Sequence, residues 1–160
     1  DGQAENVVTG VRELLTQSGG DESISVIRRE MKNTLEEGAG IYRDEQGALA
    51  ACEKIAELRE RYRQIEVHDK SNVFNTDLQQ ALELRNLLDV AESVAEASLE
   101  RRESRGAHQR LDYTERDDVN FLKHSLAFRQ PDGRPRIEWS EVTITRSQPG
   151  VRDYSGGKDK

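Results

Sequence analysis

The chain has 160 residues and a mass of 18.2 kDa, a length typical of one domain. Charged and hydrophobic residues each make up 34% of it, and no apolar run is long enough to cross a bilayer. The net charge of −7 opposes attraction to nucleic acid and to anionic lipid, so the composition excludes a nucleic-acid-binding protein and indicates a soluble domain.

The first 20 residues predict a short linker helix. Apolar residues recur near helical spacing within residues 3–17, and the Ser-Gly-Gly run at 18–20 interrupts the pattern. The next helix is predicted from Ser23 to Glu37, and Gly38 and Gly40 supply its stop. Its apolar positions are Ile24, Ile27, Met31 and Leu35.

A third helix is predicted to begin after Asp44, which is suited to cap its N-terminus. Its opposite face is rich in Lys, Arg and Glu and is therefore predicted to be solvated. The single cysteine, Cys52, lies on the apolar stripe, where a thiol acts as a small hydrophobic group. Because one cysteine cannot form an internal disulfide, a reducing compartment is expected. The stripe consists of Leu49, Cys52, Ile55, Leu58, Tyr62 and Ile65.

The fourth helix, about residues 77–102, has apolar residues on more than one face, which predicts the central and most buried helix. Thr76 and Gln79 have the spacing of a capping box at its start. Two alternating runs follow, at 122–129 and 136–145, and the Pro-Asp-Gly-Arg sequence between them predicts the turn of a β-hairpin.

The predicted fold class is therefore mainly α, an antiparallel three-helix bundle that is spectrin-repeat-like. The linker helix occupies residues 1–20 and the bundle residues 21–103. An irregular segment and the β-hairpin follow at 104–148, and a disordered tail is expected at 149–160.

Three polar motifs set this chain apart from a simple bundle. Residues 71–78 read Ser-Asn-Val-Phe-Asn-Thr-Asp-Leu, residues 103–110 read Glu-Ser-Arg-Gly-Ala-His-Gln-Arg, and residues 114–124 read Thr-Glu-Arg-Asp-Asp-Val-Asn-Phe-Leu-Lys-His. In order and spacing they resemble the C-terminal part of the flavoprotein subunits of fumarate reductase and succinate dehydrogenase. The resemblance extends over about residues 24–145, and the residues of the motifs are most similar to those of the bacterial fumarate reductases.

The resemblance implies that the chain is the C-terminal domain of a larger oxidoreductase subunit. Such a subunit binds FAD, interconverts fumarate and succinate in anaerobic respiration, and passes electrons through an iron-sulfur subunit. It implies a cytoplasmic location at the inner face of the cell membrane, with membrane contact only through other subunits. This domain is expected to pack on the flavin-binding domain of its own subunit and to support assembly.

No cofactor is expected in this fragment itself. The Gly-x-Gly-x-x-Gly fingerprint that cradles a dinucleotide is missing from the sequence. In the resembled family the catalytic residues lie in the flavin-binding and capping domains, and none of them maps onto this chain. We therefore assign no catalytic, cofactor-binding or metal-binding residue, and we expect the isolated chain to be inactive.

The second and third motifs nevertheless contain residue types used in catalysis. Arginine can grip a carboxylate and histidine can move a proton near neutral pH. The stronger interpretation is structural, because an irregular segment after a buried helix needs donors for free carbonyl groups. A divalent-metal site at the neighbouring acids is the weaker alternative, since arginines nearby can neutralise them. The residues predicted to face another domain or subunit are Arg105, His108, Arg110, Arg116, Asp117 and Asp118.

Several alternatives to a fumarate reductase domain stay open. Succinate dehydrogenase shares the same domains and catalyses the reaction mainly in the opposite direction. The direction depends on redox potentials that this fragment does not determine. L-aspartate oxidase has a similar Glu-Ser-Arg-Gly stretch. A freestanding three-helix interaction module would account for the helices and leave the motif at 103–124 without a role.

Overall fold

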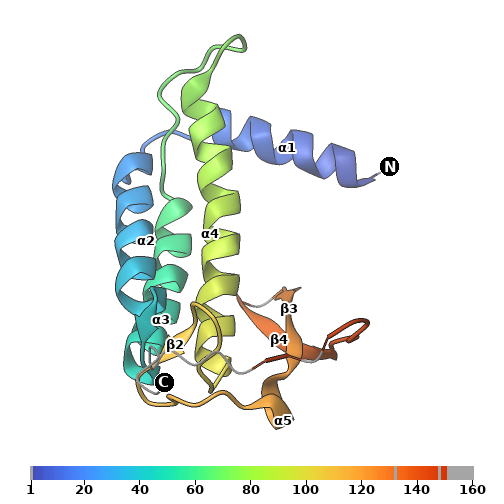
Figure 1. The fold of residues 1–160 in the computed structure, drawn as a ribbon. Helices are drawn as coiled ribbons and strands as arrows, with labels where there is room; N and C mark the ends of the chain where they lie inside the picture. The colour runs from blue at the N-terminus through green and yellow to red at the C-terminus, as the bar shows by residue number, and fades with distance from the viewer. Residues whose placement is uncertain (1, 132, 148, 151–160) are drawn as a thin grey trace.

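The computed structural model describes residues 2–131, 133–147 and 149–150. It confirms the mainly α class, with α2, α3 and α4 side by side as a bundle and a β-hairpin beside its lower end (Figure 1). Most of the predicted tail, residues 151–160, lies outside the described residues. The elements are α1 (Gly2–Thr16), α2 (Ile24–Ala39), β1 (Tyr42–Arg43), α3 (Glu45–Tyr62), α4 (Thr76–Glu100), β2 (Gln109–Arg110), α5 (Asp118–Phe121), β3 (Lys123–Gln130) and β4 (Gly133–Glu141).

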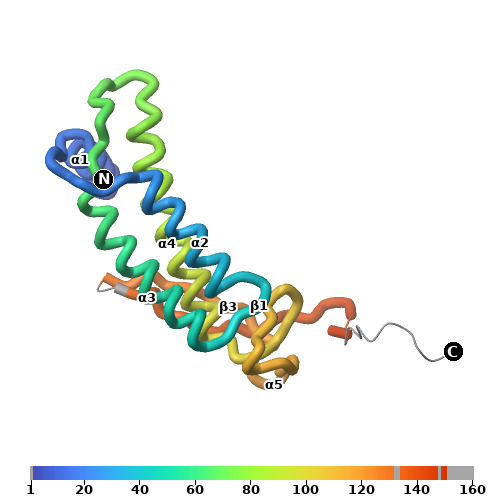
Figure 2. Tube along the Cα trace, turned by 90° about the vertical axis from the view of Figure 1, so that its left-hand side faces the viewer, coloured from blue at the N-terminus to red at the C-terminus, as the bar shows by residue number. Residues whose placement is uncertain are grey.

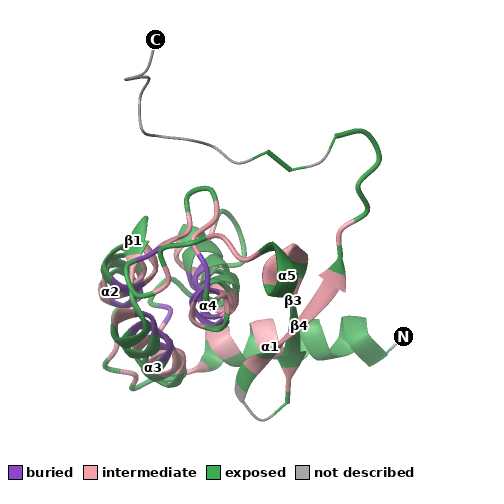
Figure 3. Cartoon of the chain, turned by 60° about the horizontal axis from the view of Figure 1, so that its bottom comes forward, coloured by how far each residue is buried: buried purple, intermediate pink, exposed green. Residues whose placement is uncertain are grey.

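The core lies where the apolar stripes of α2, α3 and α4 meet, and the buried residues are gathered between these helices (Figure 3). Burying such side chains is the main favourable term in folding. Ile65, which we placed on the stripe of the third helix, follows the end of α3 and is still fully buried. The largest apolar side chains of the core that are almost completely buried are Ile27, Ile55, Leu58, Ile65, Leu84, Leu88 and Val67.

The start of α4 differs from the prediction. Asn75 caps the helix, because its Oδ1 accepts a hydrogen bond from the backbone N–H of Leu78 at 2.7 Å. Thr76 is the first residue of the helix and does not cap it, so the predicted capping box with Gln79 was wrong. An asparagine side chain both accepts and donates, so it can serve the helix and the preceding loop together.

The end of α2 also differs, since Gly38 is not a stop. The helix continues to Ala39, and Gly40 follows as its C-cap. Gly38 is buried, and a Cβ atom there would overlap the carbonyl oxygen of Gly47 at the start of α3. The glycine therefore permits the backbones of α2 and α3 to approach closely.

The helix α4 is central, with contacts to α2, α3 and both strands of the hairpin. One stripe of it is nevertheless open to solvent, with Leu87 at 40%, Val90 at 61% and Val94 at 43% exposure. The helix is therefore central, as predicted, but this part of its apolar surface is not buried.

The hairpin is antiparallel, with Ser125 opposite Trp139, and its second strand ends at Glu141 rather than at 145. The ring of Trp139 packs edge-on against Phe121, 5.2 Å between centroids, and the guanidinium of Arg101 lies 4.8 Å from the Trp139 ring. A two-stranded hairpin is marginal alone, so these contacts at the end of α4 stabilise it.

A short parallel pair, β1 with β2, was not predicted. Tyr42 is paired with Gln109, and Arg43 with Arg110. The backbone N–H of Gln109 donates to the carbonyl oxygen of Ile41 at 3.1 Å. This pair fixes the motif at 103–110 against the connection between α2 and α3.

The first helix, α1, projects away from the bundle and has no buried residue (Figures 1 and 2). It is attached at its C-terminal end, where Gln17 Nε2 donates to the carbonyl oxygen of Arg63 at 2.7 Å. The backbone N–H of Gly19 donates to Glu66 Oε2 at 3.0 Å. Across the described part of the chain, no helix is both long and apolar enough to span a membrane.

Candidate functional site

Glu103 is the centre of the motif that follows α4. Its side chain is fully buried, and Oε1 accepts hydrogen bonds from Arg101 Nη1 at 2.6 Å and from Arg105 Nε at 2.8 Å. Its Oε2 accepts from Arg105 Nη2 and from the backbone N–H of Asp117, each at 2.9 Å. Burial acts to raise the pKa of Glu103, but the hydrogen bonds outweigh it and hold the pKa below its ordinary value. The charged carboxylate therefore joins the end of α4 to the segment before α5.

Arg110 is the second centre, and it is 1% exposed. Its Nη1 donates to the carbonyl oxygens of Ser98 and Leu99, each at 3.1 Å, and of Arg101 at 3.3 Å. Its Nε and Nη2 donate to the two carboxylate oxygens of Asp112, each at 2.7 Å. These two parallel hydrogen bonds from Arg110 lower the pKa of Asp112 to about 2. Arg110 thus satisfies carbonyl groups at the end of α4 and lies inside the domain.

His108 lies on the same side as Arg110. Its Nε2 is 2.9 Å from the carbonyl oxygen of Arg101. Burial lowers the pKa of His108, and the positive charges of Arg43 and Arg110 lower it further. Because a carbonyl oxygen only accepts, the neutral ring carries its proton on Nε2 and donates it. The imidazole therefore holds the chain in place.

The remaining predicted residues form a chain of ion pairs near α5. Asp118 accepts from Arg105 Nη2 at 2.6 Å with one oxygen and from Arg116 Nη2 at 2.7 Å with the other. Asp117 caps α5, since its Oδ1 accepts from the backbone N–H groups of Val119 at 3.1 Å and Asn120 at 2.9 Å. These acids are thus engaged as caps and ion-pair partners. Within the described ranges, no group of three or more His, Cys, Asp or Glu residues could hold a metal ion.

The structure thus assembles the predicted site residues into two groups joined through Arg101. Arg105, Arg116, Asp117 and Asp118 lie around Glu103, while His108 and Arg110 lie at the end of α4. Glu103 was not singled out from the sequence, although an acid among arginines at 101, 102 and 105 was a usable signal.

The chemistry available to this network is limited. Each of its arginines already donates to a carboxylate or a carbonyl group, so binding of a substrate carboxylate would compete with these bonds. Cys52, in the bundle, is 1% exposed, and burial together with the charge of Glu96 raises the pKa of its thiol to about 12. Such a thiol is a poor nucleophile. The geometry favours a structural network, and its role as a surface facing another domain stays a prediction.

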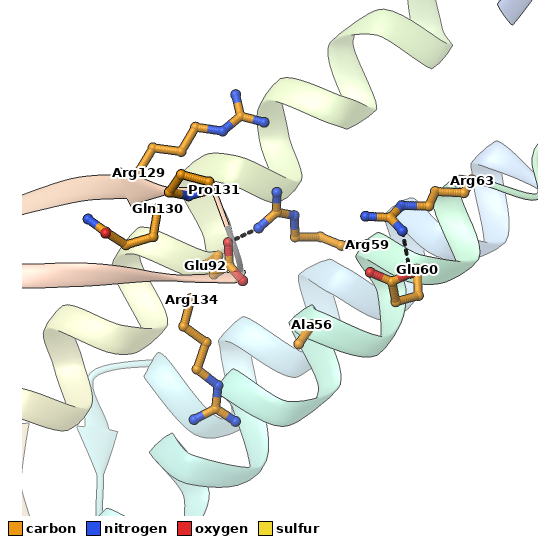
Figure 4. A pocket seen from close by; sticks show the side chains of 9 residues that line it. All are labelled: Ala56, Arg59, Glu60, Arg63, Glu92, Arg129, Gln130, Pro131 and Arg134. Carbon is orange, nitrogen blue, oxygen red and sulfur yellow. Dashed lines mark hydrogen bonds and ion pairs between the residues drawn. The ribbon is translucent and has the colours of Figure 1, made fainter.

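One hollow, with a volume of about 400 Å³, lies between α3, α4 and the tip of the hairpin (Figure 4). Arginines surround it, but Arg59 is paired with Glu92 and Arg63 with Glu60. Arg134 Nε lies 3.4 Å from Glu96 Oε1. These pairs neutralise the arginines, so the hollow does not offer an open anion site. Its lining residues are Ala56, Arg59, Glu60, Arg63, Glu92, Arg129, Gln130, Pro131 and Arg134.

The first turns of α3 and α4 do not fit the phosphates of a dinucleotide. A dinucleotide needs a glycine-rich turn whose N–H groups face its phosphates at the start of a helix. Here the first turns of α3 and α4 are occupied by the side chains of Asp44 and Asn75, which accept from those N–H groups. The negative charge of Asp44 would also repel a phosphate.

Comparison with known proteins identifies the family. The family model described as fumarate reductase flavoprotein C-term matches residues 28–154. The fumarate reductase flavoprotein subunit of Haemophilus influenzae is 58% identical over 154 residues, which are 96% of this chain and 26% of that protein. The succinate dehydrogenase flavoprotein subunit of Rickettsia bellii is 37% identical over 138 residues, 86% of this chain and 23% of that protein.

A solved structure of Escherichia coli quinol fumarate reductase FrdA matches with a TM-score of 0.90 and 49% identity, and covers 98% of this chain and 27% of that one. The chain thus spans about a quarter of the length of the relatives it matches. The family match includes most of the bundle, the network around Glu103 and the hairpin. The chain belongs to the fumarate reductase flavoprotein C-terminal family.

Proposed function

We propose that this chain is the C-terminal domain of the flavoprotein subunit of a fumarate reductase. The whole subunit would interconvert fumarate and succinate with FAD and pass electrons between quinol and fumarate through an iron-sulfur subunit. The observation that carries this proposal is the 58% identity to a fumarate reductase flavoprotein subunit over 96% of the chain. The relative is called a flavoprotein, which supports FAD in the parent protein.

The role proposed for this domain is to pack on the flavin-binding domain and to support assembly. The network around Glu103 and Arg110 supports this role, because it fixes an irregular segment without using a hydrophobic core. Fixed ion pairs and hydrogen bonds hold a surface in one shape, which lowers the cost of ordering it when it binds. We propose that Arg105, Arg116 and Asp118 shape the surface that meets the flavin domain.

The parent protein is proposed to act at the cytoplasmic face of the cell membrane, within a membrane-bound complex. Its membrane contact would be made through other subunits. The structural relative named quinol fumarate reductase supports this assignment, since a quinol is a lipid-soluble electron donor.

Succinate dehydrogenase is the second candidate for the parent protein. The 37% identity to the Rickettsia bellii subunit favours it, and the higher identity to fumarate reductase ranks it behind. Whether the parent protein mainly reduces fumarate or oxidises succinate depends on the potentials of redox centres outside this domain.

The test is to sequence the coding DNA upstream of Asp1 and to express the complete product. An in-frame region with a Gly-x-Gly-x-x-Gly fingerprint, flavin absorbance and fumarate reduction by the product would support the proposal. The 160-residue chain alone is expected to show neither flavin absorbance nor activity. A start codon immediately before the codon of Asp1, or tight stoichiometric FAD binding by the chain alone, would contradict it.

A further inference from the structure

The loop between α3 and α4 presents two apolar side chains to solvent. Val73 is 69% exposed and Phe74 is 95% exposed. Phe74 also has a φ of 54°, the one positive value among the described non-glycine residues. A bulky residue in this left-handed region is strained, and strain of this kind persists where the surrounding structure imposes it.

The polar side chains of the loop supply that surrounding structure. Asn75 Nδ2 donates to the carbonyl oxygens of Asp69 at 2.6 Å and Ser71 at 2.9 Å. Asp69 Oδ1 accepts from the backbone N–H of Ser71 at 2.8 Å, and Asp77 Oδ2 accepts from that of His68 at 2.6 Å. The polar residues of the motif at 71–78 therefore hold the loop, and the apolar pair Val73 and Phe74 is exposed within it.

We infer that Val73 and Phe74 form a docking knob for the part of the same polypeptide that precedes this domain. This inference rests on the proposed function, in which the chain continues a longer subunit. A rigid loop with an exposed aromatic side chain binds at little cost in conformational entropy, and buried aromatic anchors contribute strongly to interfaces. The knob is expected to enter an apolar pocket of the preceding domain.

The position of α1 favours this occupant. The loop lies at the end of the bundle where α1 is attached, as two perpendicular views show (Figures 1 and 2). Lys70 Nζ donates to the carbonyl oxygen of Gln17 at 2.9 Å, which ties the loop to the end of α1. A polypeptide that enters through α1 is thus linked directly to the knob.

The small size of the knob also favours the preceding domain of the same polypeptide as its binding partner. Two side chains bury far less than the roughly 1,200–2,000 Å² of a stable interface between separate proteins. A covalent link supplies a high effective concentration and makes a small contact sufficient. A neighbouring domain of the same subunit therefore suits the knob better than a separate subunit or a second copy of the chain.

The first experiment compares Phe74→Gly in the 160-residue chain and in the complete flavoprotein subunit. In the chain, the Tm should stay constant or rise, because glycine adopts a positive φ without strain and the lost side chain is almost free of contacts. In the complete subunit, the Tm should fall, because the knob is lost from its pocket. The matched control is Val90→Ala, at a 61% exposed position of α4 outside the surfaces proposed here to meet another domain, which should leave both Tm values nearly constant. An unchanged or raised Tm of the complete subunit with Phe74→Gly would overturn the inference.

The second experiment labels exposed side chains by oxidation with hydroxyl radicals. Mass spectrometry then measures how much of Phe74 is oxidised. Phe74 should be labelled in the chain and lose its labelling in the complete subunit without other subunits. If other residues of this domain become protected and Phe74 does not, the inference that Phe74 docks on the preceding domain is wrong. The proposed packing of this domain on the flavin-binding domain would still be supported. If no residue of the domain becomes protected, the proposed packing fails. Protection that appears only with an added partner subunit, or only on dimerisation of the chain, overturns the inference by assigning another occupant.

Discussion

Arg110 Nη1 donates to the carbonyl oxygen of Ser98 over 3.1 Å, and this bond joins β2 to the last turn of α4. The final carbonyl groups of a helix have no partner within the helix. A side chain from a distant loop fills that need here, so the helix end and the loop are stabilised together.

Replacing Arg110 with Met should therefore lower the free energy of unfolding by about 3 kcal/mol, because buried carbonyl groups and Asp112 lose their donor. Denaturant unfolding followed by circular dichroism measures it. The control is Arg63→Met, since the Arg63 side chain is 72% exposed and pairs with Glu60 on the surface. That change should stay within about 0.5 kcal/mol. Equal losses in the two variants would mean that Arg110 has no special role.

Truncating Leu88 to Ala should destabilise the chain by roughly 2 to 5 kcal/mol, because its side chain is 1% exposed and its loss leaves a cavity in the core. Val90→Ala, two positions along α4 and 61% exposed, should change stability by less than about 0.5 kcal/mol. Chemical denaturation of both variants is the measurement. A stable Leu88→Ala variant would show that α4 does not face the core as described.

Gly38→Ala should destabilise the chain by about 1 to 3 kcal/mol, since the new methyl group forces the backbone of Gly47 away from α2. Gly10→Ala is the control within another helix, where an added Cβ meets no atom within 4 Å. Alanine there should increase helix content without loss of stability. Thermal unfolding and far-ultraviolet circular dichroism distinguish the two, and a neutral Gly38→Ala would refute the close approach of α2 and α3.

His108 should make the stability depend on pH below neutrality. Its folded pKa is lowered by burial, so between the folded pKa and the unfolded value of about 6.5 the unfolded chain binds more protons. The contribution of the neutral ring is complete above about pH 6.5 and is lost as the pH falls through the folded pKa. Denaturant unfolding of the chain and of His108→Gln should be measured at several pH values. The difference between their free energies of unfolding should become smaller as the pH falls. A constant difference, or a folded pKa above 6.5 by NMR, would contradict this.

The helices were predictable because their apolar residues recur at helical spacing and because Asp44 marks the start of α3. Errors arose where one residue type has several uses. Gly38 was interpreted as a helix end, although its use is to let another helix approach. Thr76 was interpreted as a cap, although the neighbouring Asn75 can also bond the preceding loop.

The candidate site was predictable in its residue types more than in its connections. The need for donors at the end of α4 was inferred from the arginines, and the structure places Arg110 there. The role of Glu103 and the pairing of Tyr42 with Gln109 depend on contacts between segments far apart in the chain. Periodicity within a segment carries no information on such contacts.

The pairing of β1 with β2 also sets an order of folding. Contacts of α2 with α3 and of α3 with α4 join neighbouring segments, whereas Tyr42 and Gln109 meet only after the chain has passed through both α3 and α4. Closing the larger loop costs more chain entropy, so this pair forms late, on a bundle that is already assembled. Substitutions there would speed unfolding and leave the folding rate almost constant. The motif at 103–110 would then open before the three-helix bundle.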